Sequence, residues 1–110
     1  MTNEQRTALI DRCDRMFELN AAVLKIGDRA QATGDLTDED EAIYARIVFG
    51  MGRADEAALN ALGMLGMLEG GPKLKIHMTD PAEIIARSDV LIETAEAFIL
   101  DIRLKMGEAP

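Results

Sequence analysis

The sequence predicts an all-α protein: a small bundle of three or four helices with one short extended segment, at about residues 73–78, and a long C-terminal helix. Apolar residues recur at helical spacing in three stretches of the chain. Capping residues stand at the start of each stretch. Only residues 73–78 alternate between polar and apolar as a strand does. A length of 110 residues indicates a single helical domain over residues 1–110.

The first helix begins at Thr2, where the hydroxyl can cap the helix while Gln5, three residues on, completes a capping box. Gly34 is the expected stop. Seven apolar residues fall on one face at helical spacing: Leu9, Ile10, Cys13, Met16, Phe17, Val23 and Leu24. A weaker apolar strip, Leu19 and Ile26, flanks this main face.

The second helix begins at Thr37, and the acidic residues 38–41 complement the positive end of its dipole. Its apolar face consists of Ile43, Tyr44, Ile47, Val48 and Met51. Gly50 and Gly52 each cost about 1 kcal/mol relative to alanine inside a helix. Either one long helix tolerates them because a neighbour approaches closely, or the helix breaks near Gly52. We expect a kink or break there.

The last helix has the clearest start, because Asp80 caps it, Pro81 occupies its first position and Glu83 completes a capping box. One broad apolar face contains Ile84, Ile85, Leu91, Ile92, Ala95, Phe98, Ile99 and Ile102. A second face, on roughly the opposite side, contains Val90, Ala97, Leu100 and Leu104. A helix that is apolar on two sides in so small a chain indicates a partner subunit.

The extended segment needs a partner, because an isolated strand leaves its backbone groups unpaired. It could pair antiparallel with the same segment of a second subunit, receive an edge strand of another protein, or remain a solvated connector across the bundle. Its apolar side completes the predicted dimer interface, which comprises Leu74, Ile76, Met78, Val90, Ala97, Leu100 and Leu104.

The net charge of −8 is concentrated in residues 35–69, where eight acids face two bases. Such a chain repels phosphate backbones, so we expect no direct contact with nucleic acid. The carboxylates of this region form a candidate docking patch for a basic partner: Asp35, Asp38, Glu39, Asp40 and Glu41. They lack the spacing and the central glycine of a calcium-binding loop.

No set of residues converges on a catalytic site, so we name no catalytic, cofactor-binding or metal-ligating residue and expect no cofactor. His77 is the only histidine and is expected on the polar side of the strand. Cys13 is expected to be an inert core residue. Asn20, within the apolar face of the first helix, is either a register-setting contact across an interface or a core residue bonded to backbone.

Several classes of function remain open. We expect a non-enzymatic protein–protein interaction module, such as an adaptor, assembly chaperone or small regulatory factor, that forms a homodimer and binds another protein. The alternatives are a small acidic inhibitor that mimics nucleic acid, and a small enzyme whose site is shared between subunits. The charged N-terminal residues and the absence of a long apolar run predict a cytoplasmic protein without membrane contact.

Overall fold

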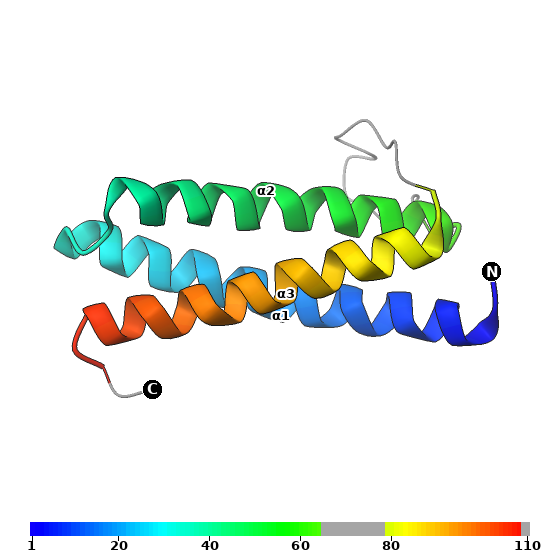
Figure 1. Cartoon of the computed structure of the whole chain (residues 1–110), viewed down its shortest axis with the longest axis horizontal. Coiled ribbons are helices and arrows are strands. Elements are labelled where there is room, and N and C mark those ends of the chain that lie inside the picture. The colour runs from blue at the N-terminus through cyan, green and yellow to red at the C-terminus, as the bar shows by residue number, and fades with distance from the viewer. Residues whose placement is uncertain (65–78, 109–110) are drawn as a thin grey trace.

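The computed structural model describes residues 1–64 and 79–108, which form three α-helices in sequence (Figure 1). Helix α1 spans Asn3–Thr33, α2 spans Asp38–Ala61 and α3 spans Pro81–Lys105. The prediction of an all-α bundle is confirmed for this part of the chain, which contains neither a strand nor a fourth helix.

The predicted extended segment, residues 73–78, lies outside the described residues. The same holds for the three interface residues and the histidine that it carries: Leu74, Ile76, Met78 and His77. The pairing of this segment therefore stays a prediction.

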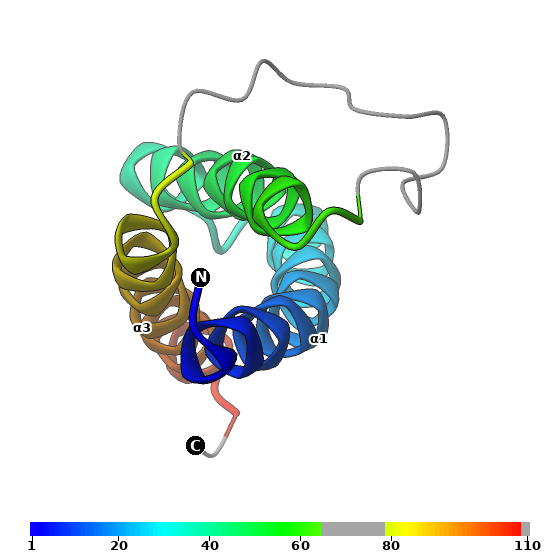
Figure 2. The same cartoon turned by 90° about the vertical axis from the view of Figure 1, so that its right-hand side faces the viewer.

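The three helices stand at the corners of a triangle when the bundle is viewed along its axis (Figure 2), and each packs against both of the others. The chain runs along α1, returns along α2 and runs along α3 in the same direction as α1 (Figure 1). Side chains of each pair of helices line a hollow on the outside of the bundle.

The helix ends follow the predicted capping chemistry. The Thr2 hydroxyl accepts a hydrogen bond from the Gln5 backbone N–H at 3.0 Å, and the Gln5 side chain accepts one from the Thr2 N–H. Gly34 ends α1 with a φ of 75°, a left-handed conformation that glycine adopts without steric cost. Thr37 and Asp40 form a second capping box. The Asp80 carboxylate accepts from the Ala82 N–H, but the reciprocal bond expected from Glu83 is not observed among the described residues.

Helix α2 continues through both glycines without a break (Figure 1), so the expected break near Gly52 is wrong. A Cβ built on Gly50 would lie 2.7 Å from Cδ2 of Leu91 in α3. The Leu91 side chain therefore occupies space that a larger residue at position 50 would need. Met51 and Ala54 are both buried in the core. Burial of these side chains offsets the propensity cost of the two glycines.

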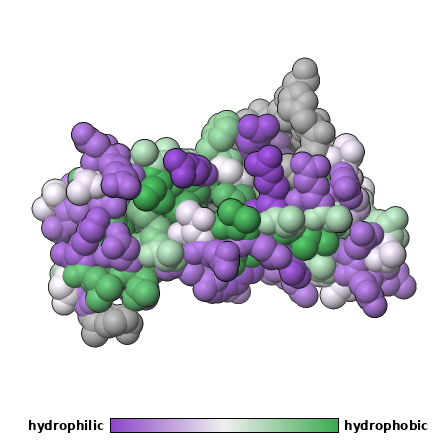
Figure 3. All heavy atoms as spheres, in the orientation of Figure 1, coloured by the Kyte–Doolittle hydropathy of each residue, from purple (hydrophilic) through white to green (hydrophobic). Residues whose placement is uncertain are grey.

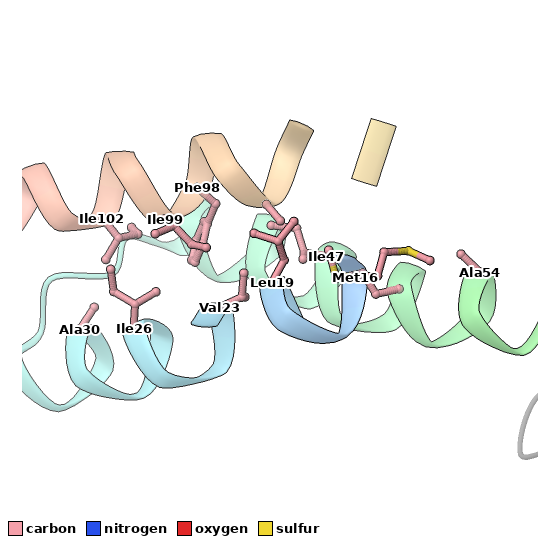
Figure 4. Close-up of a cluster of buried hydrophobic side chains, with 12 residues drawn as sticks. Met16, Leu19, Val23, Ile26, Ala30, Ile47, Ala54, Phe98, Ile99 and Ile102 are labelled. Carbon is pink, nitrogen blue, oxygen red and sulfur yellow. The ribbon is translucent and has the colours of Figure 1, made fainter. Parts of the chain in front are cut away.

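The core fills the space between the helices (Figure 4). Side chains from all three helices form the larger cluster: Met16, Leu19, Val23, Ile26, Ala30, Ile47, Met51, Ala54, Ala95, Phe98, Ile99 and Ile102. A smaller cluster contains Leu9, Ala57, Ala58, Leu62 and Ile84. The apolar faces predicted for the second and last helices are therefore confirmed as core-facing.

The face predicted for the first helix is wrong in part. Ile10, Phe17 and Leu24 are exposed, whereas Leu19 and Ile26 of the weaker strip are buried. The two apolar strips overlap on this helix, and the direction in which α2 and α3 approach decides which strip is covered. The bundle thus leaves a second apolar stripe on α1 in contact with solvent.

Candidate functional site

The second apolar face of α3 points away from the bundle. Val90 is 61% exposed, Leu100 is 45% exposed and Leu104 is 53% exposed, and Ala97 is also exposed. Figure 3 shows apolar surface at several places along α3, separated by polar side chains. We call Ala97, Leu100 and Leu104 the outer face of α3. Val90 lies nearer the N-terminal end of α3 and borders a different surface, described below.

Charged side chains flank the outer face of α3. Glu96 and Arg103 line a hollow of about 330 Å³ between α1 and α3 together with Leu100. Glu96 also contacts Arg15 of α1, with 3.6 Å between the charged atoms and both side chains about half exposed. Such an exposed pair contributes little to stability, so Glu96 can change partners at small cost.

The predicted acidic patch lies where α1 turns into α2. Asp38, Glu39 and Glu41 are exposed, and Asp35 is half-buried and accepts a hydrogen bond from the Thr33 hydroxyl. Asp40 differs from the others, because it is only 4% exposed. A docking partner would therefore meet the carboxylates of the other four residues.

Asp40 links the start of α2 to the end of α3. Both of its carboxylate oxygens accept hydrogen bonds from Lys105 Nζ, at 3.0 and 2.8 Å. The bond from Lys105 and the backbone bond from Thr37 hold the pKa of Asp40 below its ordinary value. The same contact with Asp40 raises the pKa of Lys105. This ion pair joins the N-terminal end of α2 to the C-terminal end of α3.

Cys13 lies between α1 and α2, beside Asp55. Burial raises the pKa of the Cys13 thiol to about 12, and the charge of Asp55 adds to this effect. Burial also raises the pKa of Asp55. Because the thiolate is the nucleophilic form of cysteine, this environment suppresses the reactivity of Cys13. Cys13 is half-buried rather than part of the fully buried core, and its role as an inert residue stays a prediction.

Asn20 faces the same interface, next to a small hollow of about 100 Å³ that Met16, Phe17 and Met51 also line. Its Oδ1 atom is buried and has no hydrogen-bond partner among the described residues. The predicted bond from Asn20 to backbone is therefore not observed for this oxygen, and a contact across an interface stays a prediction.

Tyr44 and Asp80 lie toward opposite ends of the bundle (Figure 1). Tyr44 packs its ring against Gly27 of α1 and lies 6.1 Å from the Phe98 ring. Burial, followed by the charge of Asp28, raises the pKa of its hydroxyl. Asp80 caps α3 at the far end of the bundle. Among the described residues, no three histidine, cysteine, aspartate or glutamate side chains are placed to hold a metal ion.

A groove of about 590 Å³ lies between α2 and α3. We call it the arginine groove and define it by its lining residues: Arg46, Phe49, Gly50, Arg53, Ala54, Arg87, Val90 and Leu91. Phe49 is 58% exposed, and the Arg53 guanidinium lies 5.9 Å from the centre of its ring. Figure 3 shows strongly hydrophilic side chains beside apolar surface along this boundary.

The arginine groove is not predicted from the sequence, because its residues come from two helices that only tertiary packing brings together. A signal was nevertheless present on α2. Arg46, Phe49 and Arg53 recur at helical spacing on the side opposite to the apolar face, so an aromatic ring is placed between two bases.

Comparisons of the chain with protein-family models, with curated proteins and with solved structures find no match. None of the described helices has the length and apolar character needed to cross a membrane.

Proposed function

We propose that the protein is a non-enzymatic protein–protein interaction module that forms a homodimer through the outer face of α3. The observation that carries this proposal is the exposure of Leu100 and Leu104 on a helix whose opposite side is already buried in the core. Exposed apolar side chains that follow one helix are a common basis for helix–helix association.

The spacing of the apolar residues and the charges beside them favour a second copy of the chain as the partner of this face. Val90, Ala97 and Leu104 recur every seven residues, and Leu100 lies three residues after Ala97, which is the spacing of a coiled-coil seam. In an antiparallel pair with its twofold axis near Leu100, Glu96 of each copy faces Arg103 of the other. A twofold contact therefore brings opposite charges together twice.

The test compares the mass in solution of the wild type with that of a Leu100→Glu, Leu104→Glu variant. We expect the wild type to be a dimer at micromolar concentration and the variant a monomer, because four carboxylates would lie in the apolar contact. Sedimentation equilibrium measures both masses.

Phe17→Glu is the matched control, because Phe17 is 80% exposed and lies on α1 beside the groove opposite α3. This control is expected to remain dimeric. A wild type that is monomeric at micromolar concentration would overturn the proposal, as would a Phe17→Glu variant that dissociates while the α3 variant does not.

A further inference from the structure

We propose that the arginine groove binds an acidic amphipathic helix of another protein. The apolar side chains of this helix would lie on the floor of the groove, and its carboxylates would pair with the three guanidinium groups at the rim. This inference goes beyond the homodimer proposed above, because it concerns a different surface and a partner of different chemistry.

Apolar residues of both helices line the groove. Phe49 and Val90 are each more than half exposed and face the groove from α2 and α3. Between them, Gly50 carries no side chain, and Leu91 fills part of the space that a Cβ would take. Apolar anchor residues of a partner would cover surface that no described residue of the bundle covers.

The three arginines at the rim of the groove have no carboxylate partner in the part of the chain that the structure describes. Arg6, Lys25 and Arg103 also lack an ion pair among the described residues, but none of them lines this groove. The four remaining bases of the described chain are paired with acids: Arg12 with Asp89, Arg15 with Glu18 and Glu96, Arg29 with Glu108, and Lys105 with Asp40 and Asp101. In contrast, Arg46, Arg53 and Arg87 form no ion pair with any acid in residues 1–64 and 79–108.

This cluster of positive charge contrasts with the net charge of the whole chain, which is −8. Arg46 and Arg53 are the only two bases in residues 35–69, and both line this groove. Three guanidinium groups around an apolar floor complement carboxylates that flank an apolar side chain.

The spacing of the arginines favours a helical partner. Arg46 and Arg53 are seven residues apart on α2, which corresponds to two turns and about 10.5 Å along the axis. Acidic residues seven apart on a helix that lies in the groove would match them. A helix there also follows the recurring arrangement in which an amphipathic helix presents its apolar side to a groove between two others.

Other occupants fit the groove less well. A twofold contact between two copies through this groove would place three arginines against the same three arginines. A head-to-tail contact between copies would not close and would form an open chain of subunits. A nucleic acid would bring its phosphate backbone close to a protein of net charge −8, whereas a short helix brings only a few negative charges.

The test uses two synthetic helical peptides of about five turns. Both have leucine along one side, and the first has glutamate at positions seven apart beside the leucines, where the second has glutamine. Each is titrated into the isotope-labelled full-length protein and followed by NMR. We expect the glutamate peptide to bind about tenfold more tightly and to shift the amide signals of Phe49, Val90 and Leu91, because two or three charge pairs together contribute on the order of 1.4 kcal/mol.

An Arg46→Gln, Arg87→Gln variant checks that the charges act within the groove. It is expected to bind the two peptides within about twofold of each other while unfolding within about 0.5 kcal/mol of the wild type, because both arginines are exposed and unpaired. The matched control, Arg6→Gln with Lys25→Gln, removes the same charge from exposed positions of α1 and should keep the tenfold preference.

Four outcomes would overturn the inference. They are equal binding of the two peptides, no detectable binding of the glutamate peptide at millimolar concentration, signal shifts confined to other surfaces, and tighter binding of a single-stranded oligonucleotide in the same groove. None of them bears on the dimer, because the α3 variant and the groove variant change different residues.

Discussion

Helix α2 borders a groove on each side, and the two grooves differ in whether their polar groups are buried or exposed. Toward α1, the Asp55 carboxyl and the Asn20 amide oxygen are drawn into the interface, and the hollow beside them is small. Toward α3, the arginines stay at the rim of a groove several times larger. Each groove has an exposed phenylalanine, Phe17 or Phe49.

This difference shows that an exposed aromatic residue alone does not define a binding surface. In the groove toward α1, buried polar groups lower the stability of the bundle and point inward. In the arginine groove, charged groups face solvent and are free to meet a partner. We therefore expect substitutions in the first groove to change stability, and substitutions of the arginines to change binding.

The largest change in stability is expected for Asn20→Leu. Leucine removes the buried Oδ1 atom that lacks a partner among the described residues, and it can extend into the adjoining hollow. We expect the free energy of unfolding to rise by about 1–2 kcal/mol, because the cost of a buried unpaired oxygen disappears. Urea denaturation followed by circular dichroism measures this quantity. An unchanged or lower stability would show that the Asn20 oxygen is satisfied in solution.

A smaller change is expected for the two glycines of α2, which face different grooves. A Cβ at Gly52 would meet nothing within 4 Å, so Gly52→Ala should raise the free energy of unfolding by about 0.5–1 kcal/mol. At Gly50 the new Cβ would displace Leu91, so Gly50→Ala should gain less or lose stability. Thermal or urea unfolding of the two variants decides this. An equal gain for both would contradict the close approach of α3 at Gly50.

The smallest change is expected for Asp55→Asn and depends on pH. Burial raises the folded-state pKa of Asp55, so ionisation of this group favours the unfolded chain. Ionisation of Asp55 therefore lowers the free energy of unfolding as the pH rises from 3.8, the ordinary pKa of aspartate, through the higher pKa of the folded state. Asp55→Asn should raise the free energy of unfolding at pH 7 by less than about 1 kcal/mol, because the group is partly exposed, and should have little effect at pH 3.

Urea denaturation of wild type and Asp55→Asn at both pH values tests this sign. Asp40→Asn is the matched control, because the pKa of Asp40 is lowered instead. The Asp40 contribution is present above the ordinary pKa and is lost as the pH falls, so Asp40→Asn should destabilise the protein at pH 7. The same response from both variants would contradict the assigned environments.

The sequence allowed the helix ends to be predicted because they depend on local chemistry. Thr2, Thr37 and Asp80 accept hydrogen bonds from backbone groups within three residues of themselves, and Gly34 adopts its conformation through its own backbone. The core-facing sides of α2 and α3 were predicted for a similar reason. On α2 a single apolar face recurs at helical spacing, and on α3 one apolar face is broader than the other.

Features that depend on contact between helices could not be predicted from the sequence. On α1 two apolar strips overlap, so only the packing decides that Leu19 is buried while Phe17 is exposed. The course of α2 through Gly50 depends on Leu91 in another helix. The arginine groove likewise combines residues of α2 with Arg87, which is far away in the chain.

The position of Tyr44 has a practical consequence. The chain has one tyrosine and no tryptophan, so a single ring accounts for nearly all of its ultraviolet emission. This ring belongs to α2, packs on Gly27 of α1 and lies near Phe98 of α3. It is therefore an intrinsic fluorescent reporter of the junction between all three helices. Because it is not among the residues that line the arginine groove, its signal can follow unfolding separately from the docking of a partner.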